Sequence, residues 1–273
     1  RQSKSIHHNE EKLIWLTEPS NDSQNIVLSI FSETIDLWRH LNHFASLDNM
    51  ICSIHQPNYI PYLWLFAKLA QSDIFVFYDN AQYTKGDYHN RNTIKWPNGP
   101  ILLSLPVQVK LGQTINEVTF DSRILPKHLK TIQESYRKAS FFSEIHPIVE
   151  EIYSYQGNSI ADFNRATITK IASFISPKVK LVLLSEILPV LETKSTKALV
   201  DICQAVSATH YISWAWGKDY LDPSLFEAAK IWLEFQDFHH PIYPQLWGDF
   251  LPYMSVLDAL YNVGIEGTQK LIS

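Results

Sequence analysis

Polar side chains follow two apolar runs in the first third of the chain and could hold a small ligand. His55, Gln56 and Asn58 come directly after one such run, and Asp79 closes the next. A histidine gives or takes a proton near neutral pH, and amide groups both donate and accept hydrogen bonds. We predict that His55 is a general acid or base with Asp79 as a second catalytic residue, and that Gln56 and Asn58 bind sugar hydroxyls or a nucleobase. The alternative is a polar turn in which these side chains only satisfy the backbone.

The loop after Asp79 is rich in amide groups and positive charge. Its predicted substrate-binding residues are Gln82, Lys85, Asn90, Arg91 and Asn92. Arginine binds phosphate or carboxylate through two parallel hydrogen bonds, and a nearby lysine adds charge. The loop therefore suggests a site for the diphosphate of a sugar nucleotide. A solvated surface loop is the competing interpretation.

Two later segments supply candidates from distant parts of the chain. Lys218, Asp219 and Tyr220 follow one short apolar run, and His240 and Gln245 follow another. A lysine that is removed from water can act as a nucleophile, so Lys218 is predicted to be catalytic. The other four are predicted to bind substrate. They join the first cluster only if the strands before them lie side by side.

No metal site is predicted. Asp237, His239 and His240 are close in sequence, but adjacent side chains on an extended segment point in opposite directions. No further histidine has the spacing of a metal ligand. No residue pattern in the sequence indicates a particular cofactor, so the cofactor is unknown.

One enzyme class shares part of the pattern. A histidine after a strand, then a helix, then a strand that ends in aspartate is similar to nucleotidyltransferases of the His-x-x-His type, in which a helix N-terminus holds the phosphates. The second histidine is missing here, because positions 58 and 59 are Asn58 and Tyr59. The chain also lacks a glycine-rich phosphate loop. A nucleotidyltransferase relative therefore remains a third choice.

The elements that must position these residues alternate between strands and helices. Apolar and β-branched runs predict parallel strands at 51–54, 74–78, 180–184, 211–212 and 231–235. Apolar residues at helical spacing predict helices at 59–70, 125–136, 148–153, 160–174, 223–229 and 251–263. A further helix is marked by Leu199, Ile202 and Val206 and is expected to be entered through Thr193 or Ser195 as N-cap. The predicted class is α/β, a mostly parallel sheet flanked by helices with a helical middle segment. Ligands of such sheets bind at the carboxyl ends of the strands, where His55 and Asp79 fall.

Three further features complete the predicted elements. Two more strands are expected, at 101–107 and 118–120, and a turn is expected at 96–100. Gly264 is predicted to end the last helix, because glycine adopts the left-handed conformation common at helix C-termini.

Composition excludes several classes of protein. The formal net charge is −5, so no overall field attracts nucleic acid or an anionic membrane. The two cysteines, Cys52 and Cys203, lie in apolar runs, which is typical of buried thiols in a reducing compartment. No run approaches the roughly 18 apolar residues of a transmembrane helix, and no leader pattern opens the chain. We predict a cytoplasmic protein with a small-molecule substrate, no nucleic-acid partner and no transmembrane segment.

Two parts are predicted along the chain. Residues 1–49 are predicted to form an N-terminal extension with an amphipathic helix, marked by Ile30, Phe31, Ile35, Trp38, Leu41 and Phe44. Residues 50–273 form the α/β domain. Met50 lies directly before its first strand, and an added helix that packs on the main domain is the alternative.

Three ordered blocks carry a resemblance to a known family. The first contains HQPNYIP at 55–61, SDIFVFYD at 72–79 and NRN at 90–92, and the second contains Ser213 with GKDYLD at 217–222. The third contains QD at 236–237, HP at 240–241 and YPQ at 243–245, followed by Gly248, Phe250, Pro252, Ser255, Asp258, Asn262 and Gly264. Together they resemble the WbqC-like proteins of bacteria, whose genes often lie among those for O-antigen and other surface polysaccharides. The resemblance spans 50–264 and implies a polysaccharide role through gene context, without a defined reaction.

The chain departs from that family at two places. Trp64 stands where the family tends to have a small residue, often glycine, and 213–216 stands where it tends to have a Ser-Gly-Pro-like turn. Glycine lets a ligand approach the backbone closely, and tryptophan does not. The resemblance therefore implies either a reshaped site or an activity that differs from that of other members.

The preferred function is a transferase of O-antigen or surface-polysaccharide biosynthesis that acts on a nucleotide-linked or amino sugar. A non-catalytic sugar- or nucleotide-binding protein is the first alternative. Donor, acceptor, reaction type and oligomeric state are left open by the sequence.

Overall fold

Five short apolar runs form one parallel sheet in the computed structural model, which describes residues 49–273. The order across the sheet is β7-β2-β1-β8-β9, and every neighbouring pair is parallel. This confirms the predicted α/β class. Except for Asn49, the predicted extension 1–49 and its helix lie outside the described residues. The strands are β1 (Ile51–His55), β2 (Ile74–Phe77), β7 (Lys180–Leu183), β8 (His210–Ser213) and β9 (Trp232–Phe235).

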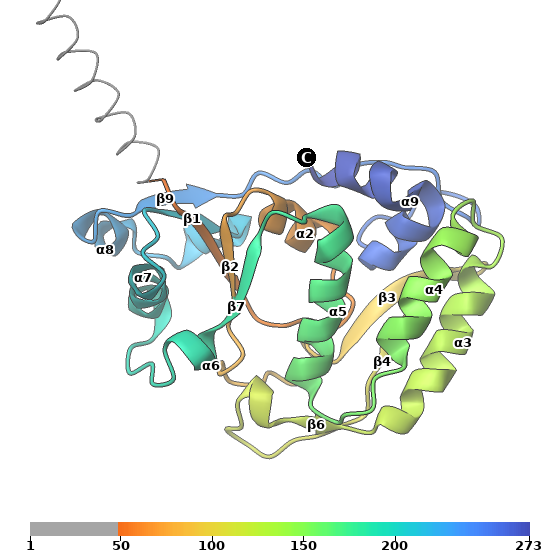
Figure 1. Cartoon of the computed structure of the whole chain (residues 1–273), viewed down its shortest axis with the longest axis horizontal. Helices are drawn as coiled ribbons and strands as arrows, with labels where there is room; N and C mark the ends of the chain where they lie inside the picture. The colour runs from red at the N-terminus through yellow and green to blue at the C-terminus, as the bar shows by residue number, and fades with distance from the viewer. Residues whose placement is uncertain (1–48) are drawn as a thin grey trace, which may run out of the picture. The chain divides into compact units, whose positions relative to one another are not determined.

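Helices cover both faces of this sheet, with α7 and α8 on one side and α2, α5 and α9 on the other (Figure 1). Alternation along the strands explains the two layers, because successive side chains point to opposite faces. In β2, Ile74 and Val76 join the cluster on the α7 side, and Phe75 and Phe77 join the other cluster. The helices are α2 (Leu63–Ala70), α3 (Leu125–Tyr136), α4 (Phe142–Tyr153), α5 (Ile160–Ile175), α6 (Leu184–Ile187), α7 (Ser195–Ala205), α8 (Pro223–Ala228) and α9 (Val256–Ile272).

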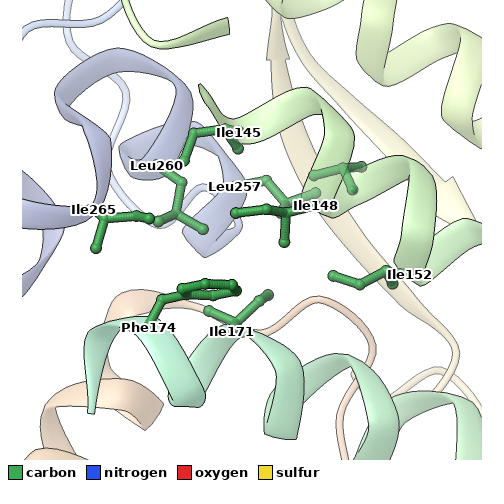
Figure 2. A pocket seen from close by; sticks show the side chains of 9 residues that line it. Ile145, Ile148, Ile152, Ile171, Phe174, Leu257, Leu260 and Ile265 are labelled. Atoms are coloured by element: carbon green, nitrogen blue, oxygen red, sulfur yellow. The ribbon is translucent and has the colours of Figure 1, made fainter. Parts of the chain in front are cut away.

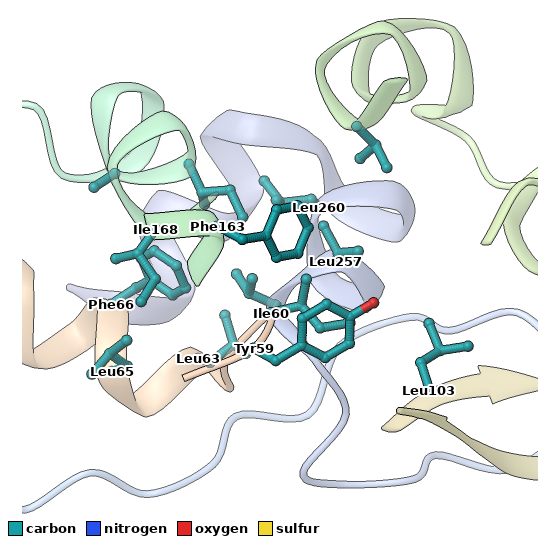
Figure 3. Close-up of a cluster of buried hydrophobic side chains, with 14 of the residues drawn as sticks. Tyr59, Ile60, Leu63, Leu65, Phe66, Leu103, Phe163, Ile168, Leu257 and Leu260 are labelled. Carbon is teal, nitrogen blue, oxygen red and sulfur yellow. The ribbon is translucent and has the colours of Figure 1, made fainter. Parts of the chain in front are cut away.

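The larger core forms where α2, α5 and α9 meet. Figure 3 shows Tyr59, Phe66, Phe163 and Leu257 side by side in this cluster. All four are at most 1% exposed. The turn between β1 and α2 is therefore anchored on the main core, which holds the polar residues after β1 in place.

An antiparallel hairpin lies outside the main sheet. Its turn and second strand were predicted, and its first strand was not. The turn at 96–100 is present, but Arg91–Trp96 forms β3, whose first two residues, Arg91 and Asn92, were predicted to lie in a ligand-binding loop. Its partner is β4 (Gly99–Ser104). The predicted strand 101–107 is divided, because Pro106 cannot donate to a ladder and separates β4 from β5. The remaining short elements are β5 (Val107–Gln108), β6 (Thr119–Phe120) and the 3₁₀ turns η1 (Ile115–Glu117), η2 (Ser122–Ile124) and η3 (Ala215–Asp219).

Several helix boundaries differ from the expected ones. Helix α2 starts at Leu63 rather than at 59, because Ile60 has a positive φ of 35° and Pro61 follows it. Helix α9 starts at Val256, where the Ser255 side chain accepts a hydrogen bond from the Leu257 amide. Gly264 has the expected left-handed φ of 72° but kinks the helix instead of ending it.

Helix α4 begins earlier than expected. It starts at Phe142 rather than at 148 and contains Pro147 in its interior. Helix α7 starts at Ser195, within the predicted entry at Thr193 or Ser195, and Lys194 is its N-cap residue. The predicted helical middle segment is present as the consecutive helices α3, α4 and α5.

Candidate functional site

A cavity of about 790 Å³ opens at the carboxyl ends of β1 and β8, and we call it the sheet-edge cavity. Its wall combines nine aromatic side chains with six polar ones and two aliphatic ones. The aromatic residues are Tyr62, Trp64, Tyr78, Tyr88, Tyr211, Trp214, Trp216, Tyr220 and Tyr253. The polar residues are His55, Gln56, Asn58, Lys68, Asp87 and Ser213, and the aliphatic ones are Ile54 and Leu199.

Two buried main-chain carbonyl groups behind the cavity wall accept hydrogen bonds from the same side chain. The Asn164 amide nitrogen on α5 donates to the Pro57 carbonyl at 2.9 Å and to the His89 carbonyl at 2.7 Å. The Tyr59 amide also donates to the Tyr88 carbonyl at 2.9 Å. These bonds fix the turn after β1 against the loop before β3. The polar side chains of the turn and those of the loop are therefore held next to each other.

His55 ends β1 and is held as a neutral imidazole. Its Nδ1 lies 2.7 Å from the Gln56 carbonyl oxygen, which assigns the proton to Nδ1 and leaves Nε2 as an acceptor. Burial and then the nearby Lys68 charge lower the pKa of His55 to about 3. Its ring packs edge-on against Trp64 with centroids 4.9 Å apart. His55 can therefore accept a proton or hydrogen bond, but in the free protein it has no proton on Nε2 to give.

Gln56 and Asn58 present amide groups to the cavity in different ways. The Oε1 atom of Gln56 lies 2.7 Å from Nε2 of the buried His89, so its NH₂ group is left to donate. Asn58 is 6% exposed and lines the cavity, yet its side chain makes no hydrogen bond within residues 49–273. Buried amides are normally paired. Asn58 therefore has an open donor and an open acceptor facing the cavity.

Lys68 lies in the same wall and is 1% exposed. Its Nζ donates to the main-chain carbonyl of Ile54 at 3.0 Å and lies 5.9 Å from the centre of the Tyr211 ring. Burial lowers the pKa of Lys68 to about 8. The described part of the chain offers this amine no carboxylate partner.

Three tryptophans form a connected aromatic wall. The Trp64 and Trp214 rings are 4.1 Å apart, and Trp214 and Trp216 are 5.2 Å apart, both edge-to-face. Trp64 and Trp214 are the two positions at which the sequence departs from the small residues of the resembled family. The structure brings Trp64 and Trp214 into contact in one wall of the cavity.

Part of the rim is formed by residues that the sequence did not point to. Tyr62 and Tyr88 pack edge-to-face at 5.2 Å, and the Asp87 carboxylate accepts the Tyr88 amide at 2.7 Å. Tyr253 has a left-handed φ of 59°, and its amide donates to His240 Nε2 at 3.2 Å. His240, a predicted binding residue, thus lies behind Tyr253 and supports it.

The predicted catalytic residues Asp79 and Lys218 do not line the sheet-edge cavity. Asp79 is 4% exposed and accepts hydrogen bonds from the amide and hydroxyl of Ser185 at 3.0 and 2.6 Å. It holds the first turn of α6. Lys218 is exposed, with its Nζ 5.6 Å from the centre of the Phe235 ring. Of the three predicted catalytic residues, His55 alone lines the cavity.

The predicted loop residues also lie outside the wall. Arg91 donates to the Gly86 carbonyl, and Lys85 is exposed. Asn90 donates to the Leu105 carbonyl at 2.9 Å, and Asn92 donates to the Ile60 carbonyl at 2.8 Å. Exposed Gln82 forms a bridge with Thr114. The loop instead contributes Asp87 and Tyr88 to the cavity.

Among the later candidates, only Tyr220 reaches the wall. It is 66% exposed at the cavity rim, and its neighbour Asp219 is exposed outside the wall. Gln245 lies in a buried network, where its Nε2 donates to Asp258 at 2.7 Å and its Oε1 accepts from Lys95 at 3.0 Å. Gln245 therefore has its partners inside the protein.

A signal for Lys68 was present in the sequence. Every other residue of α2 is apolar, so the helix is apolar on all sides and must be buried. A single lysine in such a helix must be buried with it. The aromatic partners from β8 and the segment before α9 carry no comparable local signal.

A second hollow within residues 49–273 is too small to hold a ligand. Figure 2 shows an apolar crevice between α4, α5 and α9, lined by residues such as Ile148, Ile171 and Leu260. Its volume is about 10 Å³, the size of one water-sized probe. Among residues 49–273 no group of three or more His, Cys, Asp or Glu side chains could hold a metal ion.

The fold and the cavity define an α/β protein with a large aromatic-lined cavity at the carboxyl edge of a parallel sheet. The model of the WbqC-like protein family matches residues 56–270, and the chain belongs to this family. The uncharacterized protein Rv1507c of Mycobacterium tuberculosis is 34% identical over 226 residues, which cover 80% of this chain and 96% of that protein. No solved structure matches the chain. No helix in the described range is both long enough and apolar enough to cross a bilayer.

Proposed function

We propose that this chain is a cytoplasmic transferase of surface-polysaccharide biosynthesis that acts on an amino sugar or a nucleotide-linked sugar. The observation that carries the proposal is the sheet-edge cavity, with a volume of about 790 Å³ and a mixed aromatic and amide wall. Small-molecule sites typically measure about 300–1,000 Å³ and lie at this edge of α/β sheets.

The wall chemistry favours a sugar. Aromatic faces such as Trp64 and Tyr88 can cover the apolar side of a sugar ring, and the open amide groups of Gln56 and Asn58 can bind its hydroxyls. No phosphate-binding arginine lines the cavity, and Asp87 is a carboxylate able to pair with an amine. These features favour the amino sugar over the nucleotide-linked sugar.

His55 supplies the acceptor for the reacting hydroxyl or amine. Its Nε2 is unprotonated in the free protein, because burial lowers the pKa of the ring to about 3. An incoming nucleophile can donate to that nitrogen and become aligned for attack. We propose His55 as this base and Asn58 as a binding residue beside it.

The test is a thermal-shift screen of the full chain with glucosamine, N-acetylglucosamine, UDP and UDP-glucose. We expect an amino sugar to raise the unfolding temperature by binding the folded state. Asn58→Ala should weaken that binding by about 0.5–1.5 kcal/mol per lost hydrogen bond. Gln82→Ala is the matched control, because Gln82 is exposed and lies outside the cavity wall. A shift that survives Asn58→Ala unchanged would place the sugar elsewhere.

A non-catalytic sugar-binding protein is the second candidate. The low pKa of His55 favours it, because the ring cannot act as an acid in the free protein and is a weak base. His55→Ala distinguishes the two. In a transferase, the turnover rate should fall by a factor of roughly 10²–10⁴. In a binding protein, only the affinity for the sugar should fall. A nucleotidyltransferase relative is disfavoured, because Lys85 and Arg91 lie outside the cavity wall.

A further inference from the structure

Lys68 is a buried amine that the fold leaves without a counter-charge. It is 1% exposed, it lines the sheet-edge cavity, and its one hydrogen bond within residues 49–273 goes to the Ile54 carbonyl. Burying an ammonium group is costly unless it is paired. An arrangement that serves the fold alone would be expected to supply a carboxylate here.

The neighbouring titratable groups do not neutralise this amine. Cys52 and Cys203 are buried near it, and a hydrogen bond with Cys52 together with burial raises the pKa of the Cys203 thiol. Tyr211 contributes its ring face, and burial raises the pKa of its hydroxyl. The Cys203 thiol and the Tyr211 hydroxyl therefore stay protonated and uncharged at neutral pH. The surroundings favour the uncharged, nucleophilic form of the lysine.

We infer that Lys68 is a covalent site of the sheet-edge cavity, where its Nζ forms an imine with an aldehyde or ketone group of a sugar-sized molecule. The inference rests on the cavity of the proposed function and adds a covalent step to it. The uncharged Nζ attacks the carbonyl carbon and a C–N bond forms, giving a carbinolamine. The C–O bond then breaks, and the oxygen leaves as water with the two amine hydrogens. The step needs no oxidant, reductant or other co-reactant.

The cavity limits which carbonyl compounds can reach the amine. Lys68 is covered on all other sides, so a reactive molecule must enter through the aromatic rim formed by residues such as Tyr88, Trp216 and Tyr220. Asn58 and Gln56 lie in the same wall and offer hydrogen bonds to hydroxyl groups. A small polyhydroxylated aldehyde or ketone matches this environment, and a polymer-bound aldehyde does not.

The experiment is reductive trapping on the full chain at pH 7.5 with glyceraldehyde and sodium cyanoborohydride, read by peptide mass spectrometry. We expect Lys68 to be labelled at least about tenfold faster than an ordinary lysine amine, because burial lowers its pKa to about 8 and it is therefore uncharged far more often at this pH. Aldehyde-bearing dextran should label exposed lysines and leave Lys68 unmodified.

Two variants separate chemistry from folding. Lys68→Arg keeps a charge and a donor for the Ile54 carbonyl but cannot form the imine, so it should fold and lose the fast label. Lys218→Met removes an exposed lysine outside the cavity wall and should keep that label. Labelling of exposed lysines with Lys68 unmodified in the folded chain would overturn the inference. Amino-sugar binding without a Lys68 adduct would reject the covalent step and leave the proposed function standing.

Discussion

Two buried lysines show how differently the fold treats two polar regions. Lys95 and Lys68 are each 1% exposed. Lys95 belongs to what we call the C-terminal polar network, formed by Lys95, Tyr136, Tyr243, Gln245 and Asp258. Its Nζ donates to Gln245 at 3.0 Å and to the Asp249 carbonyl at 2.5 Å. Within the part of the chain that the structure describes, Lys68 in the sheet-edge cavity has a single hydrogen-bond partner, the Ile54 carbonyl.

The carboxylate at the centre of the network is fully satisfied. One Asp258 oxygen accepts from the Tyr136 hydroxyl at 2.8 Å, and the other accepts from Tyr243 at 2.9 Å and Gln245 at 2.7 Å. In the cavity, by contrast, neither the Asn58 side chain nor the Nε2 atom of His55 has a hydrogen-bond partner among residues 49–273. A complete buried network stabilises and orients the elements around it. Incomplete bonding beside an open volume instead leaves groups available to a ligand.

Among these variants, Asp258→Ala should cause the largest loss in the free energy of unfolding. It removes the acceptor for two hydroxyls and an amide, and it leaves Lys95 buried with less compensation. Breaking such a buried charged network typically costs about 3–5 kcal/mol. Urea unfolding should show this loss in the free energy of unfolding. Asp87→Asn at the cavity rim is the control and should leave the unfolding midpoint unchanged.

Exchanging each buried lysine for methionine should separate the two regions. Lys95→Met loses two charge-assisted hydrogen bonds and should lower the free energy of unfolding by about 2–3 kcal/mol. Lys68→Met removes an uncompensated buried charge, so stability should stay the same or rise. The measurement is again urea unfolding at pH 7. Equal losses in both variants would contradict the proposed difference between network and cavity.

The pH dependence of stability should carry a smaller signature of Lys68. Its folded pKa of about 8 lies below the ordinary value of 10.5, so the unfolded chain binds more protons between these values. Stability should therefore rise with pH in this window, by about 1–2 kcal/mol between pH 7 and pH 9 relative to Lys68→Met.

Urea unfolding of the wild-type chain and Lys68→Met at each pH cancels most of the titration of Cys203, Tyr211 and His55, the groups near the amine. If the free energy of unfolding changes with pH in the same way in both proteins, Lys68 is solvated or paired in the folded chain and the prediction is wrong.

Local patterns were sufficient to predict the sheet. The strands at 51–54 and 74–78 are short apolar runs that must be buried on both faces, which requires a parallel sheet covered by helices. The same logic placed His55, Gln56 and Asn58 at a carboxyl end, where the cavity lies. Strand order and boundaries such as the start of α9 depended on contacts outside each segment.

The direction of each polar side chain was decided by tertiary partners. Asp79 follows a strand as His55 does, but the Ser185 amide and hydroxyl from α6 take both of its oxygens. Arg91 begins a strand that sequence periodicity did not reveal, and it donates to the Gly86 carbonyl instead of facing the cavity. A residue type shows which bonds a side chain can make, but not which neighbour will be near enough to make them.

The sequence by itself determined the α/β class, the strand-end position of the His55 cluster and the burial of α2 with its lysine. Tertiary structure decided that Trp64 and Trp214, far apart in the chain, share one wall, and that Lys68 meets β1 and β8 at the cavity. The physical reason is that burial and periodicity follow from local composition. The choice of partner depends on long-range packing, which no single segment encodes.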